Sequence, residues 1–365
     1  MREVNMRFRR SHRIVWAAFL LGSVVACAPA RTPDGSPTTA EGASQAQSGA
    51  QGSGGSAAGL RRDDSKDVYR FVAVGDTGYA NEAQARVLRG IQKRCDQAGG
   101  CDGFLLPGDA VYGDPLEGPE APQLEEKIGD PFSVLKKGPP PAEGEEDDRP
   151  RMPVYFALGN HDLGDDAEYD EDRIEYWTEY ASERDWFHFP SELWSRRLGF
   201  VRLIGVNTTP MDDRGESAQR QADFVDDVLA DGRARWNIML AHDPYRSNAL
   251  HGNAEKGSKL RRWVERNVCG RIDLYLSGHD HTRQWLGRVP KLSSTAEICD
   301  TYFAVSGAGS YPRDLRERGN DPEFASDELG FLFIELRRDR GRVEFCNADG
   351  ETDWSTHIAP LAARE

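Results

Sequence analysis

The chain contains few cysteines, and no two of them form a Cys-Xaa-Xaa-Cys pair. Six cysteines occur in 365 residues. Structural zinc sites use closely spaced pairs of this kind, so none is expected. Basic residues are also in deficit, because 46 Lys and Arg stand against 61 Asp and Glu, giving a formal net charge of −15. Since an acidic protein repels phosphate backbones, we do not expect this chain to bind a nucleic-acid scaffold.

Long apolar runs are nearly absent. The one run of note, Ile14–Ala26, is too short for an ordinary membrane span. Four arginines within residues 7–13 precede it, which is typical of an export signal. The run ends in Ala26-Cys27 and resembles a bacterial lipobox, with Cys27 as the lipidated first residue; the alternative is an ordinary signal cut near Ala28 or Ala30. We therefore expect an exported lipoprotein, anchored to a membrane through Cys27 on the periplasmic or cell-surface side.

Composition divides the chain into four parts. Residues 1–27 form the signal segment, and residues 28–67 are rich in Ser, Gly and Ala, with too few apolar side chains to fold, which predicts a flexible tether. Residues 68–358 carry the periodic apolar segments of a folded domain, and residues 359–365 form a tail. Within the domain, residues 114–150 are rich in Pro, Gly and acidic residues, which predicts a surface insertion.

Five cysteines remain beyond Cys27. Export permits disulfides, and Cys95 and Cys101 flank a Gly-Gly turn, so these two could close a small loop. Because five is an odd number, at least one thiol stays free or pairs elsewhere.

Short apolar runs alternate with segments of helical periodicity. The runs predict buried strands at 69–74, 104–106, 154–158, 201–206, 238–241 and 274–276. The helical segments lie at 82–97, 170–181, 217–230 and 256–268. This alternation indicates an α/β fold with mostly parallel strands. The segment from Tyr302 to Phe345 is rich in strands and predicts a second, more antiparallel sheet packed on the first.

Polar residues follow five of these strands at the point where each strand ends. They are Asp76, Asp109, Asn160–His161–Asp162, His242 and His279–Asp280–His281. Because the carboxyl ends of strands in an α/β sheet lie along one edge, we expect these side chains to converge.

The converging side chains are oxygen and nitrogen donors without a thiol, a set that suits Fe, Mn or Zn. About seven ligands are too many for one ion that keeps an open position, so two ions that share a carboxylate fit better, and such pairs cleave phosphate esters. Five of the eight histidines of the chain lie in or near these segments, namely His161, His242, His251, His279 and His281. A single histidine is more often structural, so the prediction depends on all five segments occurring together.

The motifs resemble those of the calcineurin-like metallophosphoesterases. They read GDTG at 75–78, GDAVY at 108–112, GNHD at 159–162 and GHDH at 278–281, together with His242. Tyr112 makes the second motif similar to that of the purple acid phosphatases. The segments 241–252, 277–285, 304–310 and 330–336 look like the small, tartrate-resistant type, although Thr77 stands where that type commonly has Trp. The resemblance implies an α/β/β/α sandwich of two sheets with a metal site at the carboxyl ends of the strands.

The resemblance also implies a role for each site residue. Asp76, Tyr112 and His281 would bind Fe(III), and Asp109 would bridge the two ions. Asn160, His242 and His279 would bind a second ion, Fe(II), Zn(II) or Mn(II). His161 and His251 would flank the substrate as candidate proton donors to the leaving group. Asp162 could orient His161, or could simply cap the following turn.

The expected activity is hydrolysis of small phosphate monoesters by a metal-bound hydroxide, as in an acid phosphatase. One alternative is a Mn or Zn phosphodiesterase that acts on nucleotides or phospholipid headgroups. Another, of a different class, is a surface lipoprotein that binds a partner without catalysis.

Overall fold

The computed structural model describes residues 66–164, 169–211, 216–232 and 234–361. The predicted signal segment with Cys27, nearly all of the predicted tether and residues 362–365 lie outside this part. Within it, no helix is both long and apolar enough to cross a membrane.

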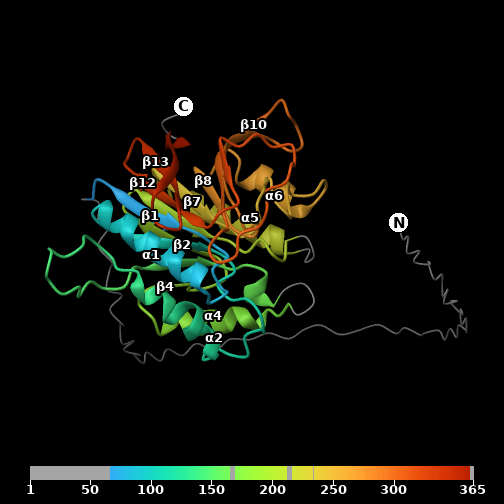
Figure 1. Cartoon of the computed structure of the whole chain (residues 1–365). Helices are drawn as coiled ribbons and strands as arrows, with labels where there is room; N and C mark the ends of the chain where they lie inside the picture. The colour runs from blue at the N-terminus through green and yellow to red at the C-terminus, as the bar shows by residue number, and fades with distance from the viewer. Residues whose placement is uncertain (1–65, 165–168, 212–215, 233, 362–365) are drawn as a thin grey trace, which may run out of the picture. The chain divides into compact units, whose positions relative to one another are not determined.

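Two seven-stranded sheets form the centre of the domain (Figure 1). The first sheet has the order β14-β13-β12-β1-β2-β3-β4. Its strands are β1 (Tyr69–Ala73), β2 (Gly103–Pro107), β3 (Val154–Ala157), β4 (Phe187–His188), β12 (Gly330–Leu336), β13 (Gly341–Asn347) and β14 (Thr352–Ile358). Strands β1 to β4 are parallel to one another, whereas β12 runs antiparallel to β1 and is followed by two further antiparallel strands.

The second sheet has the order β11-β9-β10-β8-β7-β6-β5. Its strands are β5 (Trp194–Leu198), β6 (Val201–Gly205), β7 (Trp236–Leu240), β8 (Leu274–Ser277), β9 (Arg283–Pro290), β10 (Ile298–Ser306) and β11 (Phe324–Ser326). Strands β6, β7, β8 and β10 are parallel to one another, and β5, β9 and β11 each pair with a neighbour in antiparallel orientation. The predicted strands were therefore found, but their division between sheets was wrong. The C-terminal strands do not form a sheet of their own, because β9 to β11 extend the second sheet and β12 to β14 extend the first.

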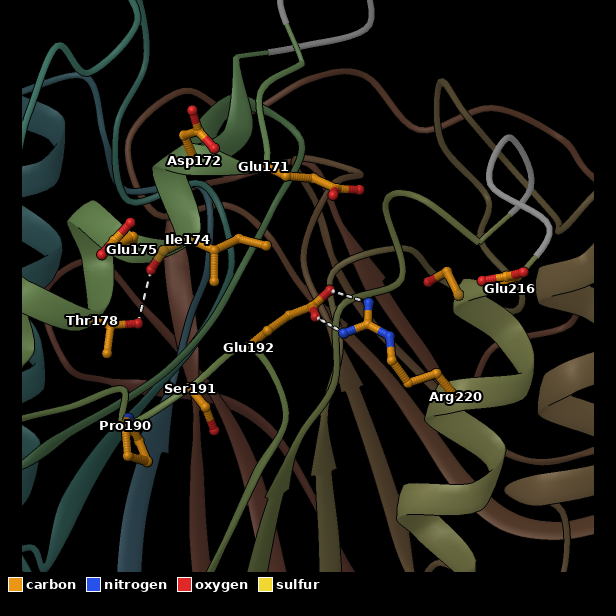
Figure 2. A pocket seen from close by; sticks show the side chains of 11 residues that line it. Glu171, Asp172, Ile174, Glu175, Thr178, Pro190, Ser191, Glu192, Glu216 and Arg220 are labelled. Atoms are coloured by element: carbon orange, nitrogen blue, oxygen red, sulfur yellow. Dashed lines mark hydrogen bonds and ion pairs between the residues drawn. The ribbon is translucent and has the colours of Figure 1, made fainter. Parts of the chain in front are cut away.

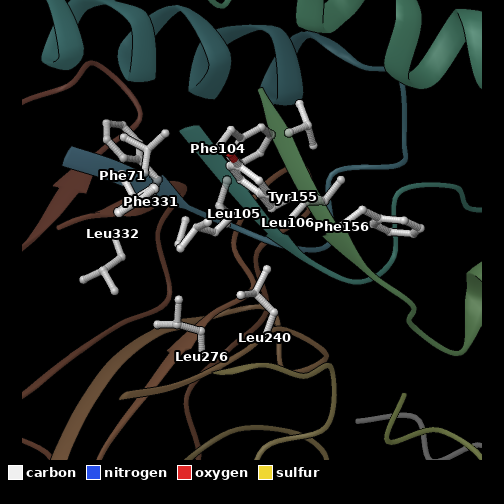
Figure 3. Close-up of a cluster of buried hydrophobic side chains, with 14 of the residues drawn as sticks. Phe71, Phe104, Leu105, Leu106, Tyr155, Phe156, Leu240, Leu276, Phe331 and Leu332 are labelled. Carbon is white, nitrogen blue, oxygen red and sulfur yellow. The ribbon is translucent and has the colours of Figure 1, made fainter. Parts of the chain in front are cut away.

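Apolar side chains fill the space between the sheets. Figure 3 shows Leu105 and Leu332 of the first sheet facing Leu240 and Leu276 of the second. All four are buried completely. Since alternate residues of a strand point to opposite faces, Phe104 turns away from this core and packs against the helical layer.

Helices cover the two outer faces. The first sheet is covered by α1 (Glu82–Gln97) and α4 (Asp172–Ser182), whose Trp177 packs on Phe156. The second sheet is covered by α5 (Ser217–Ala230) and α6 (Lys259–Asn267), which bury Val225 and Trp263 against it. The layers are thus helix, sheet, sheet, helix, which confirms the predicted α/β/β/α sandwich (Figure 1).

The predicted surface insertion at 114–150 is only partly a surface loop. Its middle contains the short helix α2 (Pro122–Leu124), a turn of π-helix and a turn of 3-10 helix. These turns bury Leu124, Ile128, Phe132 and Leu135, and the ring of Phe132 lies 5.3 Å from that of Phe104. The four residues are three or four positions apart, a helical spacing that the surrounding prolines and charges conceal. The remainder, from 139 to 150, is largely exposed.

Buried polar groups also join the two sheets. The guanidinium of Arg283 on β9 is completely buried and donates to the carbonyl oxygen of Cys346 at 2.9 Å and to Asp353 at 2.6 Å on the first sheet. The hydroxyl of Ser306 on β10 donates to the carbonyl oxygen of Ala73 on β1 at 2.8 Å. These bonds fix how the two sheets sit on each other, at the edge of the first sheet and at the end of its central strand β1.

Two disulfides fasten helices to the sheets. Cys95 and Cys101 are paired, which confirms the predicted small loop after α1. Cys269 pairs with Cys299 and ties the segment after α6 to β10. Cys346 is left as a buried thiol, as the odd count required.

Removing the longer disulfide should destabilise the domain more than removing the shorter one. The two bridges span sequence separations of 30 and 6, and a longer closed loop restricts the unfolded chain more. Cys269→Ala/Cys299→Ala should lower the free energy of unfolding by about 4 kcal/mol, and Cys95→Ala/Cys101→Ala by about 2 kcal/mol. Urea titration followed by circular dichroism measures both. An unchanged midpoint in the first variant would contradict the pairing.

Candidate metal centre

Five loops bring the predicted ligands to one edge of the sandwich. Loops after β1, β2 and β3 of the first sheet carry Asp76, Asp109, Tyr112 and Asn160. Loops after β7 and β8 of the second sheet carry His242, His279 and His281. The convergence predicted from the strand ends is therefore present, although the loops come from two sheets rather than one.

Three donor atoms form a tight triangle on one side of the site. The hydroxyl of Tyr112 donates to Asp76 Oδ1 at 2.9 Å and lies 3.0 Å from His281 Nε2. The third side, from His281 Nε2 to Asp76 Oδ1, measures 3.4 Å. We call this set the tyrosine triangle.

A second triangle lies on the other side. Asn160 Oδ1 is 3.1 Å from His242 Nε2 and 3.2 Å from His279 Nδ1. The two histidine nitrogens are themselves 3.2 Å apart. We call this set the asparagine triangle.

Asp109 connects the two triangles. Its Oδ2 lies 3.3 Å from His242 Nε2, while its Oδ1 accepts the backbone N–H of His161 at 3.0 Å. Donor atoms of Asp76, Asp109 and His242 all lie within 4.8 Å of one another. A carboxylate in this position can reach ions held by either triangle.

The triangle sides fit metal coordination. Metal–nitrogen and metal–oxygen bonds of about 2.1 Å place two ligands at right angles about 3.0 Å apart. The six sides of the two triangles run from 2.9 to 3.4 Å. The seven donors therefore suit two ions.

Backbone carbonyls orient two of the imidazoles. His242 Nδ1 lies 3.0 Å from the carbonyl oxygen of Pro107, and His281 Nδ1 lies 2.5 Å from that of Tyr311. Each Nδ1–H donates to its carbonyl, which leaves Nε2 as the nitrogen that faces the site. When His242 Nε2 carries no proton, the asparagine triangle brings lone pairs from its three side chains together, an arrangement that a cation stabilises.

Buried charge points to the same conclusion. Asp76 and Asp109 are buried, and within the described residues neither forms an ion pair with Lys or Arg. Burial raises the pKa of Asp76 well above its ordinary value. Burial opposes ionisation of Asp109 as well, but the charge and hydrogen bond of a protonated His242, together with His161 and His279, outweigh it and lower the pKa of Asp109. Burial likewise disfavours the charged form of His242, yet the charge and hydrogen bond of Asp109, together with Asp76 and Asp243, outweigh it and raise the pKa of this histidine.

Burial also keeps the remaining ligands without charge. It lowers the pKa of both His279 and His281 to about 4, so these imidazoles stay neutral and able to bind metal well into the acid range. Burial, with Asp109 and Asp76 nearby, raises the pKa of Tyr112 well above its ordinary value.

Backbone strain concentrates at these residues. Among the described residues, four other than glycine have positive φ, and three of them are Asp76, Asp109 and His279, with φ of 57°, 54° and 64°. Close packing requires the glycines that precede two of them. A Cβ at Gly108, whose φ is +86°, would lie 2.2 Å from His242 Nδ1, and one at Gly278 would lie 2.4 Å from Asp76 Oδ2. Such strain is typical of sites that hold side chains in one functional geometry.

Asp162 does not take the orienting role that was the first of its two predicted alternatives. Its carboxylate is buried and accepts the backbone N–H groups of Asp109, Ala110, Val111 and Gly159 at 2.8 to 3.2 Å. Burial, with the nearby charge of Asp109, raises its pKa to about 8, and these N–H donors partly offset the rise. Asp162 therefore shapes the loop that presents Asp109, a structural role closer to the capping alternative.

The two other predicted histidines flank the triangles. The ring of His161 lies 4.5 Å from that of Tyr112 in the tyrosine triangle. The ring of exposed His251 lies 4.0 Å from that of His279 in the asparagine triangle, and its backbone N–H donates to Asp280 at 2.8 Å. Both imidazoles are thus beside the site rather than members of either triangle.

Two residues that support the ligands, Thr208 and Asp243, were not predicted from the sequence. Thr208 Oγ1 accepts the backbone N–H groups of His242 and Asp243 and donates to Asp243 Oδ2 at 2.6 Å. Asp243 Oδ1 in turn lies 3.9 Å from His279 Nε2. Thr208 follows β6, just as the predicted ligands follow their strands. The rule that polar residues gather at strand ends could therefore have identified it.

A separate hollow between α4 and α5 is unsuited to anions (Figure 2). The described residues that line it include five carboxylates, and the one cation among them, Arg220, is paired with Glu192. None of the predicted site residues lines it.

Known proteins are similar to this chain in sequence and in fold. The calcineurin-like phosphoesterase family model matches residues 69–283. Purple acid phosphatase 4 of Arabidopsis thaliana is 24% identical over 313 residues, which cover 78% of this chain and 83% of the relative. Tartrate-resistant acid phosphatase type 5 of Homo sapiens is 24% identical over 341 residues, which cover 83% and 94%.

Solved structures agree on the fold. Purple acid phosphatase PPD1 from yellow lupin seeds matches with a TM-score of 0.58 at 16% identity, over 81% of this chain and 54% of that one. GAP50, the anchor in the inner membrane complex of Plasmodium, matches with a TM-score of 0.61 at 16% identity, over 81% and 90%.

The family model spans more than half of the chain and includes all seven predicted ligands, with His281 near its end. Purple acid phosphatase relatives of this kind imply a dinuclear metal site, for which the two triangles are suited. The chain therefore belongs to the calcineurin-like phosphoesterase family and is a phosphoesterase enzyme.

Proposed function

We propose that this enzyme hydrolyses phosphate monoesters at a binuclear metal centre, in the manner of the purple acid phosphatases. The observation that carries the proposal is the pair of donor triangles joined by Asp109. The similarity to purple acid phosphatases over most of the chain supports the same activity.

The two triangles differ in the ions that they would prefer. The tyrosine triangle would hold Fe(III), because a phenolate and a carboxylate are hard anionic ligands. The asparagine triangle has two neutral imidazoles and a neutral amide, and would hold Fe(II), Zn(II) or Mn(II). Asp109 would contribute to both sites.

When bound, the two cations would neutralise the phosphoryl oxygens and lower the pKa of a bound water. Residues of the chain itself would supply the proton that the leaving group needs. His161 and His251 stand on opposite sides of the ligand set, against Tyr112 and His279. Either imidazole could donate a proton to a departing alkoxide, and Asp162 would keep the Asp109 loop in place.

We infer the localisation from sequence features. The arginine-rich start, the apolar run and Cys27 support export and a lipid anchor, and the low-complexity residues 28–67 would hold the enzyme away from the membrane surface. The substrates would then be small phosphorylated molecules outside the cytoplasm.

Two alternative functions make different demands on these residues. A Mn or Zn phosphodiesterase would not need Tyr112 as a ligand, yet the Tyr112 hydroxyl completes its triangle at 2.9 and 3.0 Å. A partner-binding lipoprotein without catalysis would be free to lose ligands, yet all seven predicted donors are present.

Iron and Tyr112 provide the first test. The full chain should contain two metal ions, one of them iron, and show a visible tyrosinate-to-iron absorption band. It should cleave phenyl phosphate much faster than diphenyl phosphate. Tyr112→Phe should abolish the band, whereas Tyr79→Phe, which changes the ring stacked on Tyr112 at 4.3 Å, should keep it.

A colourless protein without iron that cleaves diesters at full rate would contradict this proposal and favour the phosphodiesterase. A metal-loaded protein that cleaves neither ester would favour the partner-binding function.

His161 can be tested through the leaving group. His161→Ala should keep both metals but lower kcat for an alkyl phosphate by about 100-fold, because loss of a general acid typically costs this much or more. The loss should be much smaller for p-nitrophenyl phosphate, whose leaving group needs no proton. His357→Ala, at an exposed position of edge strand β14, is the control. Equal losses on both substrates would assign His161 to binding instead of proton donation.

A further inference from the structure

We propose that Tyr79 and Tyr311 form an aromatic surface that binds the planar organic part of the substrate and so selects aromatic phosphate monoesters. This inference rests on the proposed function, which it deepens by naming a substrate class. The evidence for it is the position of these two exposed side chains and the residues that they contact.

Exposed large apolar side chains are rare in this domain. Among the described residues there are three, namely Tyr79 at 40%, Tyr311 at 51% and Ile298 at 56% exposure. Ile298 begins β10, whose far end at Ser306 bonds to Ala73 and Gly75 just before Asp76, so Ile298 lies a strand's length away from the site. The two exposed tyrosines, in contrast, lie together, with ring centroids 5.5 Å apart.

Both tyrosines contact residues of the tyrosine triangle. The Tyr79 ring stacks on that of Tyr112, with centroids 4.3 Å apart and planes 19° apart. The Tyr311 carbonyl oxygen accepts from His281 Nδ1 at 2.5 Å. The neighbouring Ser310 hydroxyl donates to the carbonyl oxygen of Asp76 at 2.6 Å. A group bound at the metals would therefore lie next to these rings.

The chemistry of this surface suits a flat, electron-rich or heteroaromatic ring. Aromatic faces bind planar groups by offset or tilted stacking at centroid distances of about 4.5–7 Å, with little loss of side-chain freedom. The Arg313 guanidinium lies 5.7 Å from the Tyr311 ring centroid, which adds a positive charge favourable to an anionic ester. The acidic hollow between α4 and α5 offers neither feature.

A purely structural role makes a different prediction. If the tyrosines only cover Tyr112, removing their rings would disturb the metal centre and slow every substrate equally. If they bind the substrate, the loss would be confined to substrates with a planar ring. The comparison therefore needs two esters that differ in the ring and not in the reacting bond.

Benzyl phosphate and cyclohexylmethyl phosphate form such a pair, because both release a primary alcohol of similar acidity. The full-length, metal-loaded enzyme should prefer benzyl phosphate about two- to tenfold in kcat/KM, as expected for one stacking interaction. Tyr79→Leu/Tyr311→Leu should bring the ratio close to one by raising KM for benzyl phosphate. Kinetics on cyclohexylmethyl phosphate and metal content should remain near those of the wild type, and Ile298→Ser should leave the ratio unchanged.

An unchanged ratio in the double variant, or equal losses on both esters, would overturn the inference. Failure of the wild type to cleave either ester with both metals bound would instead overturn the proposed function. The two failures are thus distinguishable.

Discussion

The candidate site depends on the alignment of the two sheets at the carboxyl ends of their central strands. Each donor triangle takes atoms from both sheets: His281 completes the tyrosine triangle from the second sheet, and Asn160 completes the asparagine triangle from the first. A shift of about 1 Å between the sheets would break both triangles. Hydrogen bonds across the junction, from His242 to Pro107 and from Ser306 to Ala73, oppose such a shift, and the buried apolar core holds the layers together behind them.

The same junction collects charge that the domain does not otherwise neutralise. Asp76 and Asp109 are buried, and the described residues provide them with histidines rather than with Lys or Arg. Without metal, a proton on His242 is the nearest substitute for a cation. Ions bound at the triangles would replace this proton, so metal binding and the stability of the junction should be linked. The strained backbone at Asp76, Asp109 and His279 is consistent with a site in which the position of the ligands overrides the backbone conformation that these residues normally prefer.

Much of this could be predicted from the sequence, and the limits have physical causes. The strands and helices were visible because buried runs and amphipathic periods are local signals, and Asp76 and His242 were visible because each directly follows a strand. The partition of strands between sheets was not readable, since β6 and β2 look alike locally and only long-range pairing separates them. The helical turn around Phe132 was hidden by prolines and charges. Asp162 was ambiguous because a carboxylate beside a histidine can serve either the histidine or the backbone, and its four N–H partners come from loops whose path no local pattern gives.

The whole site depends on seven side chains from two sheets holding two metal ions bridged by Asp109. Anomalous diffraction from crystals of the iron-loaded protein, collected on both sides of the iron absorption edge, would locate and identify these ions. We expect two ions per chain about 3.5–4 Å apart, with iron bound to Asp76, Tyr112 and His281, the other ion bound to Asn160, His242 and His279, and Asp109 in contact with both. A single ion, or two ions that leave Tyr112 or Asp109 unbound, would contradict this expectation.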